Sequence, residues 1–345
     1  MKDKKLRILH VHDVAFVGST LVSGLREIGA EAFFYELINL KKNKFPKPIE
    51  LIIIFLLRIF EIFRFGYFIR NNKFNVIHIH YGLFSYLPLV NRVPYFLHTH
   101  GSDVKVYLNS PIYGPIIKLG IKKAIAVFYS TPGQKTIVEA IRSDAIFFPN
   151  SVDIEVFNNK NIFSVINQRK TIFHINKLDR FKGIEKTLIA MEKLLEIETD
   201  LRLMMFGFGN AKYLANNFLR MYQNDPRIQL INNRVSHEEM VNLINNADIV
   251  IGGLETGSLG CSELEAMACS KPVICNFKYP HLYKSPPPLC NAESVNEIVD
   301  HTIHLLNDGE YSKTIGIQAN LWIKENLEKK SVAQKLLQIY NEYNQ

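Results

Sequence analysis

Short apolar segments of strand length alternate with helical segments along most of this chain. Residues 6–11 have the continuous apolar character of a strand that is buried on both faces of a parallel sheet. A helix from about residue 19 to 28 and a strand at 32–35 follow, which is the opening of a Rossmann-like domain. Because parallel strands need crossover helices between them, the alternation predicts an α/β protein with parallel sheets.

The same alternation continues toward the C-terminus, and 345 residues are enough for two domains of ordinary size. Helices are predicted at residues 184–197 and 295–306, and an amphipathic pattern over 312–343 predicts terminal helices. Further strands are predicted at residues 75–80, 94–100, 125–129, 145–148, 170–175, 201–206, 228–231, 249–252 and 273–274.

The net charge indicates which kinds of partner the protein binds, and the cysteine content indicates its cellular compartment. A net charge of +8 favours anionic partners such as nucleotides, acidic glycans or phospholipid head groups. Nucleic acid is not expected, because the basic residues are scattered and form no aromatic–basic motif. The first apolar run is too short for a signal peptide, and the cysteines contain no C-x-x-C pair. We therefore expect a cytoplasmic protein with free thiols and neither a zinc site nor a disulfide framework.

Residues 249–275 carry the motif with the clearest chemistry. A short apolar strand leads into a tight turn whose backbone can approach a ligand closely. Ser262 is the predicted N-cap of the next helix, and Glu263 and Glu265 fall in its predicted first turn. A glycine turn that feeds a helix N-terminus presents unpaired N–H groups, so it is an anion site, most often for phosphate. The turn residues are Gly257, Ser258, Leu259 and Gly260.

The segment after this turn, LEAMACSKPVI, resembles the nucleotide-sugar loop of the retaining GT-B glycosyltransferases, glycosyltransferase family 4 (group 1). In that family a glutamate of the LEAMA segment holds the ribose of the donor nucleotide, and Glu265 matches it. A second family glutamate, which touches the donor sugar, lies eight residues earlier, where this chain has Gly257. Glu255 and Glu263 repeat the spacing two residues out of register, so the donor-sugar role is not transferred to Glu255.

Three stretches in the first half of the chain also resemble family motifs. THGSD resembles a loop whose histidine contacts the donor sugar near the reacting carbon, which implies a catalytic role for His100. PNSVD, with Asn150, resembles the turn before the interdomain linker, and Gly18 corresponds to a glycine loop near the acceptor and the donor phosphate. The residues of the first motif that match are Thr99, His100, Gly101 and Asp103.

The second half continues the resemblance at residues 177–183, KLDRFKG. The family motif is Arg-x4-Lys-Gly, whose two cations bind the donor diphosphate, and Lys182 matches its lysine. Lys177 replaces the arginine, which keeps the charge but loses a bidentate fork, and Arg180 could compensate. Further donor-side positions that match the family are Gly207, Arg234 and Val235.

The resemblance implies the GT-B fold, in which two Rossmann-like domains with parallel sheets face each other across a cleft. Residues 1–155 would form the acceptor-side domain, and residues 156–169 the linker. Residues 170–325 would form the nucleotide-sugar-binding domain, and 326–345 a C-terminal helix that crosses back to the first domain.

The implied reaction is retaining transfer of a sugar from a nucleotide diphosphate sugar to an acceptor hydroxyl, in glycan or glycolipid synthesis. Lys177, Lys182 and the amides of the 257–260 turn would stabilise the departing phosphate without a metal ion. Two alternatives stay open. One is a nucleotide-sugar epimerase of similar fold. The other is a non-catalytic glycan- or nucleotide-binding protein, which Gly257 in place of glutamate makes plausible.

His-x-His occurs three times, each time at the C-terminal end of a predicted strand. Paired histidines at strand ends can hold zinc, but no carboxylate cluster accompanies them, so a metal site is not expected. The family loop accounts for His100 better, and His80 would line the same cleft. The pairs are His10 and His12, His78 and His80, and His98 and His100.

Residues 48–70 are the most apolar part of the chain. Their charged residues fall on one narrow helical stripe, and these charges argue against a transmembrane helix. Two interpretations remain: a largely buried helix of the first domain, or a helix that rests in a membrane interface. The charged stripe consists of Glu50, Arg58, Glu61 and Arg64.

Overall fold

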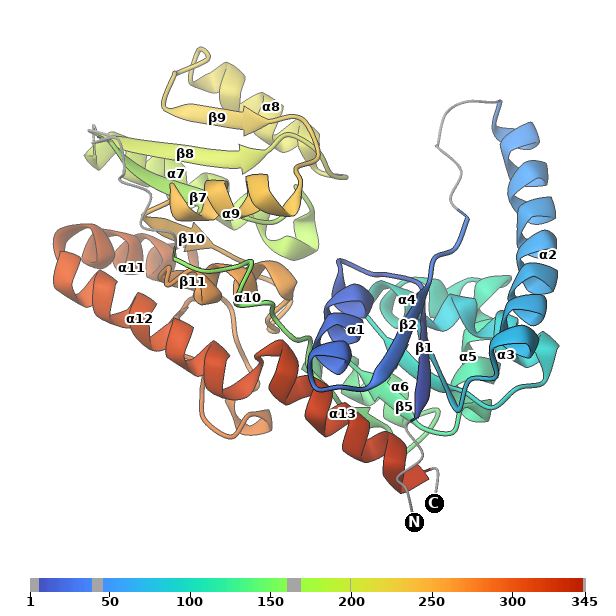
Figure 1. Ribbon diagram of the computed structural model, residues 1–345. Helices are drawn as coiled ribbons and strands as arrows, with labels where there is room; N and C mark the ends of the chain where they lie inside the picture. The colour runs from blue at the N-terminus through green and yellow to red at the C-terminus, as the bar shows by residue number, and fades with distance from the viewer. Residues whose placement is uncertain (1–5, 39–45, 160–168, 199, 344–345) are drawn as a thin grey trace. The chain divides into compact units, whose positions relative to one another are not determined.

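The computed structural model describes residues 6–38, 46–159, 169–198 and 200–343, and Figure 1 shows their secondary structure. The chain divides into two compact units, one of Met1–Ser151 with Lys329–Gln345 and the other of Val152–Glu328. The predicted boundary after residue 155 therefore lies a few residues too late. Val152 donates its N–H to the Leu327 carbonyl at 2.8 Å, and Phe157 is buried in the core of the second unit. Most of the predicted linker, residues 160–168, lies outside the described residues.

The first unit contains a six-stranded sheet in which every neighbouring pair is parallel. The strand order is β2-β1-β3-β4-β5-β6, so the order reverses between β1 and β3. The strands are β1 (Arg7–Val11), β2 (Glu31–Tyr35), β3 (Val76–His80), β4 (Phe96–Thr99), β5 (Val127–Tyr129) and β6 (Ile146–Phe147). The helices are α1 (Val17–Glu27), α2 (Lys47–Asn72), α3 (Tyr86–Asn91), α4 (Ser102–Lys105), α5 (Tyr113–Lys123), α6 (Lys135–Glu139) and α13 (Lys329–Tyr343).

The second unit has its own six-stranded parallel sheet, with the order β12-β11-β10-β7-β8-β9. Counted within the unit, this is the doubly wound order 6-5-4-1-2-3, which reverses between β7 and β10. The strands are β7 (Lys170–His174), β8 (Leu201–Phe206), β9 (Ile228–Ile231), β10 (Ile249–Ile251), β11 (Val273–Cys275) and β12 (Cys290–Asn291). The helices are α7 (Ile184–Ile197), α8 (Lys212–Met221), α9 (His237–Asn245), α10 (Cys261–Ala268), α11 (Val295–Asn307) and α12 (Gly309–Asn326).

Both sheets are buried on their two faces, as the apolar runs predict. In the second unit, adjacent residues of β7 enter different cores: Ile172 packs in one apolar cluster and Phe173 in the other. The predicted α/β class and the parallel sheets are therefore confirmed. The short β12, which carries no apolar run, was not predicted from the sequence.

Two helices of the second unit begin with a glutamate that reaches back to the backbone. Ser236 caps α9 as part of a capping box, in which the Glu239 carboxylate accepts the Ser236 N–H at 2.6 Å. The prediction of Ser262 as an N-cap is wrong, because α10 begins at Cys261 and the capping position is Gly260. The Glu263 carboxylate accepts the N–H of Gly260 at 2.8 Å, so it satisfies a backbone donor at this end.

The C-terminal helix α13 belongs to the first unit and packs on α1. The buried ammonium of Lys329 forms a 2.6 Å ion pair with Glu27 at the end of α1. The absence of a side chain at Gly24 permits this close packing, since a Cβ there would lie 2.5 Å from the Lys329 carbonyl oxygen. The last helix of the chain is thus an integral part of the unit that contains the first strand.

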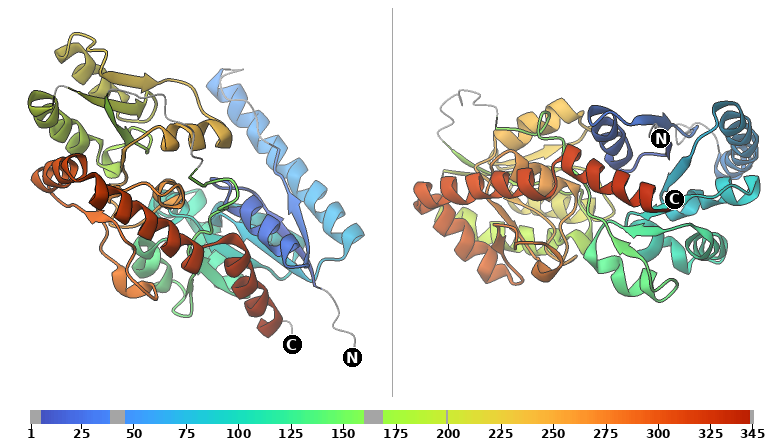
Figure 2. Two further views of the ribbon diagram at one scale, coloured as in Figure 1. Left: turned by 60° about the vertical axis from the view of Figure 1, so that its left-hand side comes forward. Right: turned by 60° about the horizontal axis from the view of Figure 1, so that its bottom comes forward.

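Helix α2 buries Glu61 of its charged stripe and exposes many of its apolar side chains. Glu61 is fully buried and accepts hydrogen bonds from the Tyr35 hydroxyl at 2.7 Å and from the Ile38 N–H at 3.0 Å. The interpretation of α2 as a largely buried helix is therefore wrong, and Figures 1 and 2 show its N-terminal half extending beyond the rest of its unit. None of the described helices is long and apolar enough to cross a membrane. The exposed apolar side chains are Ile49, Leu51, Ile52, Phe55, Leu56, Ile59, Phe60, Phe63 and Tyr67.

Candidate active site

In the second unit, the loops after β7 and β10 meet where the strand order reverses. Open α/β sheets bind ligands at this point, beyond the C-terminal ends of the strands. Leu254 donates its N–H to the Lys182 carbonyl oxygen at 3.1 Å, and Asn176 donates from Nδ2 to Glu263 at 2.7 Å. The two loops that the sequence predicts to bind phosphate are therefore brought together within one unit.

Glu263 is the buried residue that connects these loops. Its carboxylate accepts the Gly253 N–H at 2.7 Å, the Gly260 N–H at 2.8 Å and the Asn176 amide at 2.7 Å. Burial by itself raises the pKa of Glu263, but the nearby Lys182 ammonium and these hydrogen bonds outweigh it, so the pKa is lowered. A charged carboxylate thus holds the β7 loop, the β10 loop and the start of α10 in place.

The three predicted phosphate-binding cations differ in their surroundings. Lys182 is half-buried, and its ammonium interacts electrostatically with Glu263. The Lys177 side chain is 54% exposed and forms a 2.9 Å ion pair with Asp179. Arg180 is 63% exposed and pairs with Glu185 at 3.1 Å. Lys182 is therefore the cation most closely built into the junction of the two loops.

Two glycines with positive φ shape the site. Gly183 has a φ of 82°, and a Cβ there would lie 2.5 Å from the Leu254 Cβ. Gly257 has a φ of 63°, and a Cβ there would lie 3.3 Å from the Lys278 side chain. The family glutamate that this chain lacks would be strained in the backbone conformation that Gly257 adopts. The side chains of Ser258 and Leu259 are buried, so the turn offers a ligand its backbone groups rather than these side chains.

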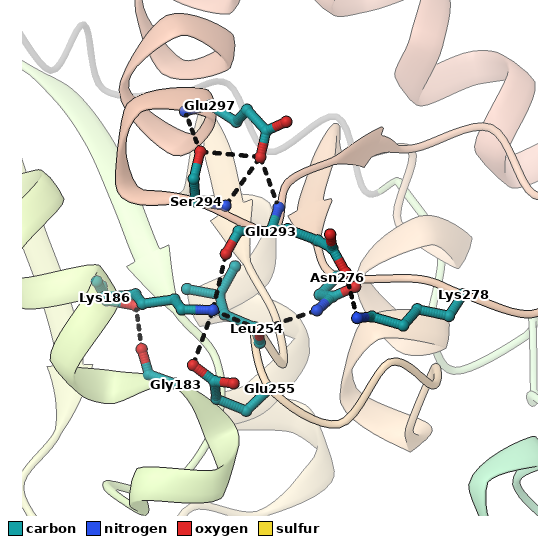
Figure 3. A network of polar contacts seen from close by, with 10 residues as sticks. Gly183, Lys186, Leu254, Glu255, Asn276, Lys278, Glu293, Ser294 and Glu297 are labelled. Carbon is teal, nitrogen blue, oxygen red and sulfur yellow. Dashed lines mark hydrogen bonds and ion pairs between the residues drawn. The ribbon is translucent and has the colours of Figure 1, made fainter.

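Glu255, the carboxylate two residues before Gly257, is held in a network of ion pairs (Figure 3). Lys186 Nζ lies 2.8 Å from Glu255 Oε1 and donates to the Glu293 carbonyl oxygen at 2.7 Å. Lys278 forms an ion pair with the Glu293 carboxylate. The structure thus gives Glu255 a role in fixing the loop after β10.

Glu265, the predicted ribose-binding residue, lies in the second turn of α10 rather than in the first, because the helix begins at Cys261. It is half-buried. Burial and the neighbouring Glu263 carboxylate raise the pKa of Glu265 to about 7. A carboxylate with this pKa accepts hydrogen bonds from hydroxyl groups more strongly once the pH exceeds 7.

The remaining predicted donor-side residues lie after β8 and β9. Gly207 follows β8, and a Cβ there would lie 2.2 Å from Asn232 Oδ1, so close packing requires a glycine. Arg234 is exposed in the loop before α9, and Val235 packs partly buried against the core. All three residues lie at the C-terminal edge of the same sheet that carries Lys182.

In the first unit, Asp103 fixes the loop that carries His100. Its buried carboxylate accepts the N–H groups of Gly82 at 2.9 Å, His100 at 3.1 Å, Gly101 at 2.9 Å and Val104 at 3.0 Å. Burial nevertheless raises the pKa of Asp103 to about 6. Asp103 therefore fixes the shape of the loop, and a substrate-binding role for Asp103, which its match to the family motif implies, stays a prediction.

Gly18 lies beside the histidines at the end of β1. Its N–H donates to Asp13 Oδ1 at 2.9 Å. A Cβ on Gly18 would lie 2.8 Å from the His12 carbonyl oxygen and 3.3 Å from the His80 ring. Asn150, which follows β6, is buried. The local packing thus explains a glycine at position 18 without reference to a ligand.

The histidines of β1, β3 and β4 form one buried cluster. Nδ1 of His10 lies 2.9 Å from Nε2 of His80, and Nδ1 of His80 lies 3.0 Å from Nε2 of His100. Burial lowers the pKa of His10 and His98 to about 3 and that of the other buried rings well below 6.5, so the rings are uncharged at neutral pH. Two trios have nitrogens close enough to hold a metal ion, and in the described part of the chain neither includes a carboxylate or thiolate. The trios are His10, His78 and His80, and His80, His98 and His100.

Sequence reasoning missed two features of these sites. Asn176, the residue before Lys177, gave no sequence signal, because its partner Glu263 lies 87 residues away. Glu263 had a signal that could have been used: it follows Gly260 by three residues, the spacing at which a carboxylate reaches back to a helix N-terminus. The histidine cluster was visible as three motifs, but their mutual contacts depend on the order of the strands.

Comparison with known proteins shows similarity to glycosyltransferases. Residues 155–322 match the family model described as Glycosyl transferases group 1. The N-acetyl-alpha-D-glucosaminyl L-malate synthase of Bacillus anthracis is 20% identical over 349 residues, covering 95% of this chain and 89% of that protein.

Two solved structures are similar over nearly their whole length. Sucrose-phosphate synthase from Thermosynechococcus elongatus aligns with a TM-score of 0.74 at 16% identity, covering 97% of this chain and 98% of that one. Anabaena Alr3699/HepE in complex with UDP-glucose aligns with a TM-score of 0.71 at 13% identity, covering 98% of this chain and 100% of that one. These likenesses confirm the GT-B fold. Residues 155–322 thus match the group 1 glycosyltransferases, and the whole chain is similar to glycosyltransferases of the EC 2.4 class.

Proposed function

We propose that this enzyme transfers a sugar from a nucleotide diphosphate sugar to an acceptor hydroxyl with retention of the anomeric configuration. The observation that carries the proposal is the junction of the two loops at the reversal point of the second sheet. There Lys182 Nζ lies 3.7 Å from the position that a Cβ would take on Gly260, the last residue of the turn before α10, and Glu263 fixes both loops. The structure of Alr3699/HepE holds UDP-glucose, which supports a donor of this chemical class.

The proposed reaction breaks the bond between the anomeric carbon and the β-phosphate oxygen and forms a bond to the acceptor oxygen. Negative charge grows on the departing phosphate, and Lys182, Lys177 and the amides of the turn are suited to stabilise it without a metal ion. The acceptor attacks on the face that the phosphate leaves, and its proton passes to the phosphate. Glu265 accepts hydrogen bonds from the ribose, and His100 orients the donor sugar.

A two-stage experiment tests this function. A panel of nucleotide sugars is first screened by thermal shift, since a donor that binds the folded state raises the Tm. The best donor is then incubated with candidate acceptors, and proton NMR of the product reports its anomeric configuration. We expect the transferred sugar in the product to keep the anomeric configuration that it has in the donor. An inverted product would contradict the retaining mechanism, and a new sugar nucleotide formed without an acceptor would favour the epimerase alternative.

We further propose that the exposed face of α2 rests on a membrane surface and that the acceptor is lipid-linked. The apolar side chains of this face point away from the core, and Arg70 and Lys73 at the end of the helix are exposed, where they would attract anionic lipid. The net charge of +8 also favours such a surface. The proposed contact is with the cytoplasmic face of the membrane.

The triple variant Leu56→Ser, Phe60→Ser and Phe63→Ser is expected to reduce binding to anionic liposomes more than tenfold, because each side chain contributes about 1.5 kcal/mol or more when buried in lipid. Its Tm should change little, because these side chains are exposed. Flotation with vesicles of phosphatidylglycerol and phosphatidylcholine measures the binding.

The matched control is Ile317→Ser with Leu321→Ser, which removes exposed apolar side chains from α12 in the second unit. Undiminished flotation of the triple variant would contradict the membrane contact. A wild-type dimer in sedimentation that dissociates in the triple variant would assign the face to a second copy instead.

A further inference from the structure

Three histidines of the first unit form a continuous hydrogen-bonded chain that ends at His100. His10 comes from β1, His80 from β3, and His100 from the loop after β4. The first contact joins His10 Nδ1 to His80 Nε2 at 2.9 Å, and the second joins His80 Nδ1 to His100 Nε2 at 3.0 Å. At the inner end, the hydroxyl of Tyr340 on α13 lies 2.6 Å from His78 Nδ1 and 3.4 Å from His10 Nε2.

Each ring of this chain is neutral and therefore carries one N–H. Burial lowers the pKa of His10 to about 3 and holds the pKa values of His80 and His100 well below 6.5. A neutral imidazole has one donor nitrogen and one acceptor nitrogen. His80 uses both of its nitrogens in the chain, so it must donate to one neighbour and accept from the other.

The geometry makes the three tautomers depend on one another, because both contacts join an Nδ1 to an Nε2. If His80 carries its proton on Nε2, it donates to His10 Nδ1 and accepts from His100 Nε2, so all three rings are Nε2–H tautomers. If His80 carries its proton on Nδ1, the directions reverse and all three rings are Nδ1–H tautomers. A chain with mixed tautomers would place two lone pairs or two protons against each other at about 3 Å, which is unfavourable.

The ring of His100 is also held in place sterically. It stacks on His98 with ring centroids 4.5 Å apart and on His80 with centroids 5.2 Å apart. His80 in turn packs against Gly18, where a Cβ would lie 3.3 Å from the imidazole ring. The His100 ring therefore cannot rotate freely, and its tautomer depends on that of His80.

We propose that His80 and His10 are positioning residues, which hold His100 in one orientation and one tautomer so that its Nδ1 has a defined hydrogen-bonding role toward a hydroxyl group of the donor sugar. The sugar contact rests on the proposed function, whereas the shared tautomer does not. Use of the same nitrogens as metal ligands would break both hydrogen bonds and would bury a divalent charge without an anionic ligand in the described part of the site. The hydrogen-bonded chain is thus the better description of the cluster.

Long-range proton–nitrogen NMR of the full chain labelled with ¹⁵N-histidine tests the proposal, because it distinguishes the two tautomers of each ring. We expect His10, His80 and His100 to share one tautomer in the wild-type protein. In His80→Phe, which keeps a ring but removes both nitrogens, His10 and His100 should each become a mixture of tautomers. The matched control is His98→Phe, since His98 bonds to the Phe148 carbonyl and not to another ring of the chain. It should leave the shared tautomer intact.

Kinetics provide the second measurement. His80→Phe should lower kcat about tenfold and leave the affinity for a nucleoside diphosphate within about twofold, because phosphate is bound by the second unit. Different tautomers among the three wild-type rings would contradict the proposed hydrogen-bonded chain of histidines. A stoichiometric metal ion in the purified protein would also contradict it, and both results can be obtained even if no variant folds. A shared tautomer together with full activity of His100→Ala would support the hydrogen-bonded chain of histidines and refute only the role of His100 in the proposed function.

Discussion

Lys182→Ala is expected to lower kcat about 100- to 1,000-fold, the loss typical when one group that stabilises a developing oxyanion is removed. Lys182 lies beside Glu263 at the junction of the two loops, where negative charge on the departing phosphate would develop. The Tm should also fall, because the buried Glu263 carboxylate loses the Lys182 cation, although it keeps its three N–H donors. Initial rates with saturating donor and acceptor measure the effect.

Two further lysine variants set the scale for this result. Lys193→Ala removes an exposed cation of α7 that bonds to Asn296, and it should keep full activity. Lys177→Ala should lower kcat less than Lys182→Ala does, because the Lys177 side chain is 54% exposed and interacts more weakly with a bound phosphate. If calorimetry showed wild-type affinity of Lys182→Ala for a nucleoside diphosphate, the phosphate site would have to lie elsewhere.

Glu263→Ala is expected to destabilise the protein by about 3–5 kcal/mol, as is typical when one partner of a buried ionic cluster is removed. The variant leaves the Gly253 N–H, the Gly260 N–H and the Asn176 amide without their acceptor. Urea unfolding at pH 7 measures the loss. Glu263→Gln should lose less stability than Glu263→Ala, because the amide oxygen of glutamine can still accept some of these hydrogen bonds.

The pH dependence of this contribution follows from the sign of the shift. The pKa of Glu263 is lowered from 4.5 in the folded protein, so its stabilisation is fully present above pH 4.5 and is lost as the pH falls through the folded pKa. The matched control is Glu239→Ala, which removes the carboxylate at the equivalent position of α9, where it is exposed. That variant should lose much less stability, because the Glu239 carboxylate is exposed to solvent. Equal losses in the two variants would contradict a special role for Glu263.

Local patterns predicted most of the framework of this protein. The strand at 201–206 and the helix at 184–197 have the bounds expected for β8 and α7, because apolar periodicity is a property of neighbouring residues. The loops that are predicted to bind phosphate could be recognised for the same reason, since their glycines and cations are close in sequence. The start of α10 was predicted wrongly, because both a serine and a glutamate can cap a helix. Here the carboxylate of Glu263 accepts the N–H of Gly260, and the helix begins before Ser262.

The orientation of α2 shows where local patterns fail. Its charged stripe is visible in the sequence, and the usual expectation places such a stripe toward solvent. In the structure this stripe faces inward, because Glu61 finds partners in Tyr35 and in the backbone of Ile38, and Arg64 lies over the Tyr35 ring. No periodicity within the helix could reveal these partners, which come from β2 and the segment after it.

The sequence by itself determined the α/β class, the positions of most strands and helices, and the loops that carry Lys182 and His100. The tertiary structure decided which of these groups meet. Asn176 reaches Glu263 because β7 and β10 are neighbours in the sheet, and His80 joins His10 to His100 because β3 lies between β1 and β4. Contacts of this kind depend on the order of strands in space, and that order follows from packing over the whole unit rather than from any local run of residues.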